Sequence, residues 1–61
     1  MDEQSAREHL SIGARVVWAE DGDIGEVKEI IQSGVYIEWE SGARGWIAFA
    51  DCQKIGLWRK K

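Results

Sequence analysis

The chain has 61 residues and carries 11 acidic against 8 basic side chains, which gives a net charge of −3 at neutral pH. A single domain of this length buries only about 60% of the surface that its unfolded chain exposes, so a second domain is excluded. The one cysteine excludes an internal disulfide, and with one histidine it cannot complete a tetrahedral zinc site without carboxylates or a second subunit. We therefore expect no cofactor and a reducing compartment.

The first ten residues are polar and lack β-branched side chains. Arg7 follows Glu3 by four positions, which is the favourable order for an ion pair on a helix. Ten residues seldom hold a helix alone in water. We interpret residues 1–10 as a flexible or partly helical arm, ordered only if Leu10 and Ile12 dock on the rest of the chain. No apolar leader is visible, and no run approaches the ~20 apolar residues of a membrane span, so we expect a cytoplasmic protein without membrane contact.

Short strand-like runs separated by glycine turns fill residues 11–56, and no proline interrupts them. We expect strands at 14–19, 24–33, 35–40, 43–49 and 53–55, with a helical or 3₁₀ turn at 50–52. In the second strand Gly25 marks a bend or bulge, and the alternation is lost after Val27, which indicates a kink there. The core residues expected from this strand are Val27 and either Ile30 or Ile31.

The third strand shows the clearest period-2 alternation in the chain. Its apolar side chains are expected to face inward and its polar ones outward: Val35, Ile37 and Trp39 against Tyr36, Glu38 and Glu40. In the fourth strand the same rule turns Ile47 inward and Trp46 outward. The fold class expected is all-β, a small five-stranded barrel that the last strand closes by returning to the first.

The runs Gly13-Ala14-Arg15-Val16-Val17, Ile24-Gly25-Glu26-Val27 and 35–42, followed by a one-turn helix before Ile55, resemble the SH3-like barrel. The resemblance covers about 45 residues and is one of spacing. Within that superfamily the chain is similar to the small photosystem I accessory subunit, to Tudor and KOW-type modules, to the cytosolic E3-ligase domains that carry V-x-W-D-x-G, and to the type II dihydrofolate reductases. These proteins differ in function, so the resemblance implies the fold alone.

Two of these families imply a site that can be compared with the residues present. The substrate-binding Val-Gln-Ile-Tyr stretch of the type II reductases would fall at 45–48, where neither the glutamine nor the tyrosine is found, so folate reduction is disfavoured. A Tudor-type cage for a methylammonium group needs aromatic walls and an acid at the rim. Trp18, Tyr36 and Trp46 would supply the walls if they converged, although Trp18 is equally well explained as a core residue.

The first functional hypothesis is a non-catalytic protein-interaction or adaptor module. Exposed aromatics supply most of the affinity of such surfaces, and surrounding carboxylates attract a basic partner. The residues proposed for partner binding are Trp18, Glu20, Asp21, Tyr36, Glu38 and Trp46. Between Glu20 and Glu40 seven acids face one lysine, so we expect a basic or amphipathic protein partner and no nucleic acid on this surface.

The second hypothesis places single-stranded nucleic acid at the basic C-terminal tail, residues 57–61. The residues concerned are Lys54, Trp58, Arg59, Lys60 and Lys61. The simpler interpretation has Leu57 and Trp58 packing back on the barrel.

A third hypothesis is a homo-oligomeric enzyme on the reductase-like scaffold, with its site on a symmetry axis. Within one chain we expect no enzyme, because His9 is the only histidine and lies in the N-terminal arm, distant in sequence from Cys52.

Overall fold

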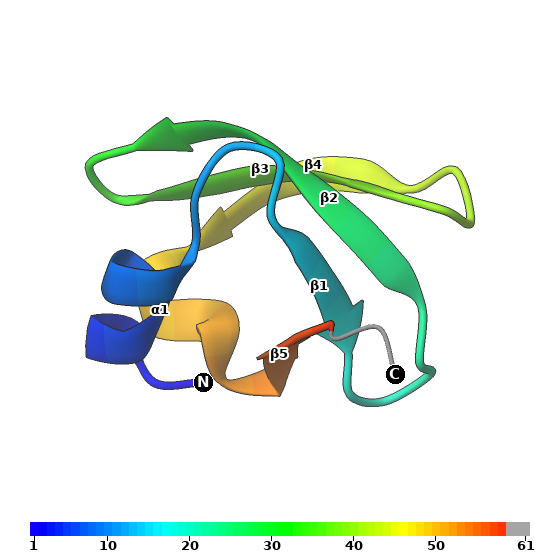
Figure 1. Ribbon diagram of the computed structural model, residues 1–61, viewed down its shortest axis with the longest axis horizontal. Coiled ribbons are helices and arrows are strands. Elements are labelled where there is room, and N and C mark those ends of the chain that lie inside the picture. Colours follow the sequence, from blue (N-terminus) through cyan, green and yellow to red (C-terminus); the bar gives the residue numbers. More distant parts are fainter. Residues whose placement is uncertain (59–61) are drawn as a thin grey trace.

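The computed structural model describes residues 1–58 of the protein and shows a mostly β fold with two short helices (Figure 1). The elements follow the order α1 (Glu3–His9), β1 (Arg15–Trp18), β2 (Ile24–Ile31), β3 (Gly34–Trp39), β4 (Arg44–Ala48), the 3₁₀ helix η1 (Phe49–Lys54) and β5 (Ile55–Leu57). The strands predicted from the sequence are all present, and the expected 3₁₀ turn before the last strand is confirmed.

The five strands form one antiparallel sheet in the order β4-β3-β2-β1-β5. The return of the last strand to β1 is confirmed, but the closed barrel predicted from the sequence is wrong, because β4 and β5 do not pair and remain the two edges of the sheet. The physical reason is that the chain leaves β4 directly into η1. Figure 1 shows η1 and α1 together on one side of the curled sheet, between its two edge strands.

The core lies on the concave face of the sheet. Val35 and Ile37 are fully buried and Trp39 packs against them on the same face, which confirms the alternation predicted for β3. The remaining buried residues of the core are Ala6, Leu10, Val16, Val27, Phe49, Cys52 and Ile55. Within residues 1–58 no polar or charged side chain is buried, so apolar contact is the main source of stability.

The expectation that Ile30 or Ile31 joins the core is wrong, since these side chains are 38% and 50% exposed. The β2–β3 register shifts between Val27 and Glu29, which confirms the kink after Val27 and places the bulge at Lys28 instead of Gly25. The register of β1 with β2 ends at Glu26, and the last hydrogen bonds from this segment join Gly13 and Ala14 to Val27. Beyond Val27 the β2–β3 hairpin continues without β1 beside it. Sequence alternation did not reveal that β1 is so short.

Helix α1 begins at an N-cap in which the Asp2 carboxylate accepts a hydrogen bond from the Ser5 N–H, 2.7 Å away. This bond lowers the pKa of Asp2, because it stabilises the ionised carboxylate. The sequence analysis expected residues 1–10 to be ordered only if Leu10 and Ile12 dock on the rest of the chain. Leu10 is buried in the core, but Ile12 is 70% exposed. Ile12 lies in the turn that leads to Gly13, whose φ of 89° directs the chain away from α1 toward β1.

The bounds of the elements also differ from the expected ones by one or two residues. The fourth strand ends at Ala48 instead of Phe49, because Phe49 begins η1 and buries its ring there. Gln53 and Lys54 belong to η1, so the last strand covers Ile55–Leu57 instead of 53–55. Along the described residues 1–58 no helix has the length and apolar character needed to cross a membrane.

Candidate binding site

Two tryptophans meet at one end of the sheet and form walls of a cleft. Trp18 is the last residue of β1 and Trp39 the last residue of β3, and because both strands run antiparallel to β2 their carboxyl ends lie at the same end of the sheet. Their ring centroids are 6.0 Å apart and their planes make an angle of 80°. Both side chains are half-buried, so each ring keeps part of its surface open to solvent.

Gly25 on β2 is required for this arrangement of the Trp39 ring. A Cβ atom at position 25 would lie 2.7 Å from Cε3 of Trp39 and 2.6 Å from Cγ2 of Ile37, closer than real carbon contacts. The Trp39 indole therefore occupies the space that a side chain at position 25 would need. Gly25 is thus a packing position, and the bulge that the sequence analysis placed there lies three residues further along.

The rim of the cleft is acidic because the β1–β2 turn carries two aspartates. Asp21 accepts a hydrogen bond from the Asp23 N–H at 2.9 Å, and the Gly22 N–H donates to the Trp18 carbonyl at 2.8 Å. Gly22 has a φ of 73°, which this tight turn needs. The cleft has a volume of about 260 Å³ and is lined by Trp18, Asp21, Asp23, Trp39, Ser41, Ala43 and Ile47.

Glu20, predicted as a member of the acidic surround, has a partner within the chain. Its carboxylate forms an ion pair with the Lys54 ammonium of η1, and both side chains are largely exposed. The lysine lowers the pKa of Glu20 by its hydrogen bond and its charge. Glu20 and Lys54 are therefore paired with each other, and the two acids left beside the cleft are Asp21 and Asp23.

Tyr36 and Trp46 form a second aromatic pair on the opposite, convex face. They are cross-strand neighbours on β3 and β4, with ring centroids 5.2 Å apart and an angle of 58° between the planes. Trp46 is 51% exposed, as expected from the alternation of β4. The predicted convergence of Trp18 with Tyr36 and Trp46 is wrong, because residues 18 and 39 face the concave side whereas residues 36 and 46 face the convex side.

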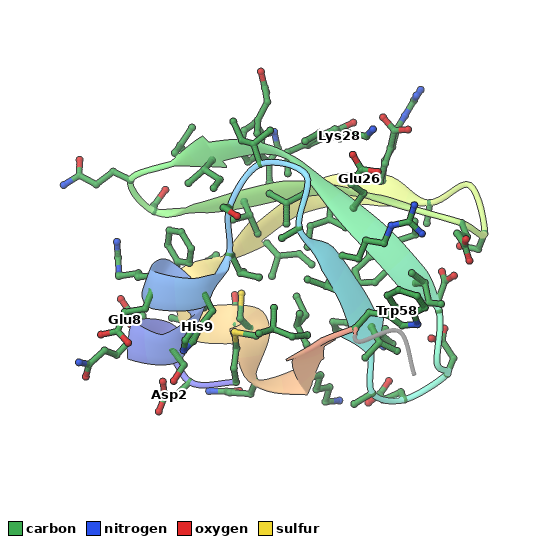
Figure 2. The ribbon with its side chains drawn as sticks, in the orientation of Figure 1. Asp2, Glu8, His9, Glu26, Lys28 and Trp58 are labelled. Atoms are coloured by element: carbon green, nitrogen blue, oxygen red, sulfur yellow. The ribbon has the colours of Figure 1, made fainter. Side chains whose placement is uncertain are left out.

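A second depression, of about 230 Å³, is lined by charges of both signs. Its lining includes Arg15, Glu26, Lys28, Glu38, Trp39 and Glu40. The Lys28 ammonium lies 3.3 Å from the Glu26 carboxylate, and Figure 2 shows both side chains on the outside of β2. Glu38 therefore belongs to this charged surface, in the cross-strand row of Arg44, and lies away from the aromatic cleft.

Part of the predicted nucleic-acid segment is within the described residues. The Trp58 N–H donates to the Arg15 carbonyl at 3.0 Å, and the Arg15 guanidinium lies 5.8 Å from the centre of the Trp58 ring, so Trp58 packs beside β1 (Figure 2). Leu57 packs against the core in β5. Arg59, Lys60 and Lys61 lie outside the described residues.

The two side chains considered for catalysis, Cys52 and His9, differ in their exposure to solvent. Cys52 is fully buried, its Sγ lies 3.4 Å from the Ala48 carbonyl oxygen, and burial raises the pKa of its thiol. His9 is exposed on α1. Among residues 1–58 no three His, Cys, Asp or Glu side chains lie close enough together to hold a metal ion.

In comparisons with known proteins the chain matched no family model, no curated protein and no solved structure. Sequence analysis had selected Trp18 and Asp21 for partner binding and had counted Asp23 among the surrounding acids, but it missed Trp39 as a member of the cleft. Trp39 was interpreted as a core residue, and only its position beside β1 shows that it also forms a wall.

Proposed function

We propose that this protein is a non-catalytic interaction module whose cleft binds one basic side chain of a protein partner. The observation that carries the proposal is the perpendicular Trp18–Trp39 pair with Asp21 and Asp23 at its rim. Indole rings attract a cation over their faces, and carboxylates at the rim attract the same charge. A lysine or arginine side chain has this combination of an apolar stem and a cationic end.

The size of the cleft supports a single side chain as its occupant. Pockets for drug-sized ligands have volumes of roughly 300–1,000 Å³, and about 260 Å³ is below that range. The apolar lining from Ala43 and Ile47 suits the methylene stem, and Asp21 and Asp23 suit the charge. A cation–π contact contributes about 0.5–2 kcal/mol, so two such contacts, one on each indole, correspond to a Kd of about 1 mM at best for a lone side-chain mimic. A longer peptide is expected to bind more tightly.

The SH3-like resemblance forms the structural part of the same proposal. Support comes from the strand order β4-β3-β2-β1-β5 and from a 3₁₀ helix directly before the last strand. In this proposal the fold is a scaffold that brings the β1–β2 and β3–β4 turns together at one end of the sheet. The Trp46 face is a separate surface and takes no part in binding the basic side chain.

The experiment titrates the full chain with the blocked amino acids N-acetyl-lysine methylamide and N-acetyl-arginine methylamide and with tetramethylammonium. Binding is followed through the indole N–H signals of the four tryptophans in two-dimensional NMR. We expect the signals of Trp18 and Trp39 to shift and saturate, while that of Trp46 stays in place. An uncharged probe, N-acetyl-norleucine methylamide, is expected to bind at least several-fold more weakly.

Asp21→Asn and Asp23→Asn test the acidic rim, because asparagine keeps an oxygen acceptor in the turn and removes the charge. Each is expected to weaken binding of the cationic probes several-fold. Glu29→Gln, on an exposed part of β2, changes the net charge by the same amount and is the matched control. Equal losses in all three variants, or shifts confined to Trp46, would contradict the proposal.

A further inference from the structure

Strand β4 has one edge that no other strand covers. The Trp39 N–H donates to the Ala43 carbonyl and the Phe49 N–H to the Ser33 carbonyl. Because main-chain groups of an antiparallel strand point alternately to its two sides, the odd-numbered residues from 43 to 49 bond to β3. The N–H and carbonyl groups of Arg44, Trp46 and Ala48 therefore point away from the sheet.

Most of these outward groups have no partner in the described chain. The Ala48 carbonyl accepts a hydrogen bond from the Cys52 thiol at 3.4 Å. From residues 1–58 no hydrogen bond reaches the outward N–H and carbonyl groups of Arg44 and Trp46 or the N–H of Ala48. Open main-chain groups of this kind are a template for pairing with another strand.

The other edge of the sheet is protected. Strand β5 has three residues, and the Ile55 carbonyl accepts a hydrogen bond from the amino group of Met1 at 2.8 Å. The Ile55 N–H donates to the Cys52 carbonyl. Of the two edge strands, β4 is therefore the longer one and the more open to pairing with another strand.

Charge and exposed apolar surface favour a second copy of this chain as the occupant. Two chains of net charge −3 repel each other on most faces, but β4 is Arg-Gly-Trp-Ile-Ala and contains no acid. Its one charged residue, Arg44, has Glu38 as its cross-strand neighbour. Trp46, at the middle of the strand, is 51% exposed and packs against Tyr36, so an apolar side chain stands at the centre of the open edge.

We propose that two copies pair antiparallel through β4, with a two-fold axis at Trp46. In this register the Trp46 N–H and carbonyl of each copy bond to those of the other, and the Ala48 N–H donates to the Arg44 carbonyl of the second copy. The two Trp46 side chains lie side by side on the convex face, and Arg44 faces Ala48, so no like charges meet. In this two-fold dimer the β4 edge of each copy is paired, so no third copy can add to it. The cleft stays open because it is on the concave face.

Proline at position 48 tests the main-chain part of the proposal. Ala48 has a φ of −65° and a ψ of 146°, which proline adopts without strain, and its N–H points away from β3. Ala48→Pro therefore removes one outward donor and keeps every hydrogen bond between β3 and β4. Trp46→Lys removes the central apolar contact and places two like charges on the axis. The matched control is Ile12→Lys, which replaces another exposed apolar side chain far from β4 in the sequence.

The measurement is sedimentation equilibrium of the full chain from about 10 µM to about 1 mM, the range of weak interfaces. We expect the mass to rise from 6.9 kDa toward twice that value for the native chain and for Ile12→Lys. Trp46→Lys and Ala48→Pro are expected to stay at 6.9 kDa, with circular dichroism spectra of the native fold. Amide exchange at Trp46 is expected to slow with concentration in the native chain.

A native mass of 6.9 kDa at every concentration would overturn the proposal. So would a folded Trp46→Lys variant that dimerises as the native chain does. If Ala48→Pro fails to fold, the Trp46 amide exchange and the Trp46→Lys mass decide between the outcomes. The experiment is independent of the cleft, whose binding of cationic probes is expected to be the same in monomer and dimer.

Discussion

The guanidinium group of Arg7 lies over the ring of Phe49, with 4.7 Å between the guanidinium carbon and the ring centroid. The same side chain donates from Nη1 to the Gln32 carbonyl at 2.7 Å and pairs with Glu3 at 3.1 Å. Arg7 therefore joins α1 to η1 and to the turn between β2 and β3. A helix of seven residues has little stability of its own, so these contacts and the burial of Ala6 and Leu10 hold it in place.

Replacing Arg7 with alanine is expected to lower the free energy of unfolding by about 1–2 kcal/mol, the sum of one cation–π contact and one hydrogen bond to a carbonyl. Arg7→Lys keeps the charge but cannot contact the ring and the carbonyl in the same planar geometry, so it should recover only part of the loss. Urea unfolding followed by tryptophan fluorescence measures both. Glu3→Gln is the control, with an expected change of about 0.5 kcal/mol or less, because the ion pair it removes is exposed. A loss in Glu3→Gln equal to that in Arg7→Ala would show that the ion pair is the main contact.

Gly25→Ala is expected to destabilise the protein by about 1–3 kcal/mol, because the new methyl group overlaps the side chains of Ile37 and Trp39. The displaced indole should also alter the tryptophan fluorescence and weaken binding in the cleft. Gly45→Ala is the matched control, since a Cβ atom there meets nothing within 4 Å. The control should be neutral or slightly more stable, because alanine restricts the unfolded chain. If the two variants are equally stable, the close packing of Trp39 on Gly25 is not what holds that ring.

The sequence predicted the elements that depend on local alternation. Val35 and Ile37 could be assigned to the core because a strand with one buried face repeats every two residues. The kink after Val27 was visible for the same reason, as a break in that repeat. The exposure of Ile30 and Ile31 was not predictable, because it depends on where β1 ends, and β1 is separated from them by a turn and by half of β2. That the barrel does not close was likewise not predictable, because it depends on the direction in which the chain leaves β4.

The candidate site was predictable only in part. The Asp-Gly turn after Trp18 placed one aromatic ring next to Asp21, and this could be recognised within four residues of sequence. The second wall, Trp39, is 21 positions further along, and its contact with Trp18 arises from the order of the strands in the sheet. The prediction that Trp18 converges with Tyr36 and Trp46 was therefore wrong. Alternation within one strand does not tell which residues of another strand lie on the same face of the sheet.

Removal of the Asp2 carboxylate is expected to change stability mainly on the acidic side. The pKa of Asp2 is lowered in the folded chain, so its contribution is present above the unfolded value of about 4 and is lost as pH falls through the folded value. Thermal unfolding between about pH 2 and 6 should show a shallower pH dependence in Asp2→Ala than in the native chain. Asp2→Asn keeps the cap oxygen and should be more stable than Asp2→Ala at neutral pH. Parallel curves for the native chain and Asp2→Ala would contradict the role of the cap.

Cys52 is expected to make the protein less stable in alkali. Burial raises the pKa of its thiol, so the folded chain keeps the proton where the unfolded chain loses it. The resulting contribution to stability is complete below the unfolded pKa of about 8.5 and is lost as pH rises through the folded value.

Urea unfolding between about pH 7 and 10.5 should therefore show a steeper decline for the native chain than for Cys52→Ala, which has lower stability at neutral pH but no thiol to ionise. Because the two proteins share every other ionisable group, the difference between the two curves isolates the thiol. Labelling by an aromatic disulfide reagent should proceed only as fast as the chain opens, and rapid labelling under native conditions would show that the thiol is accessible.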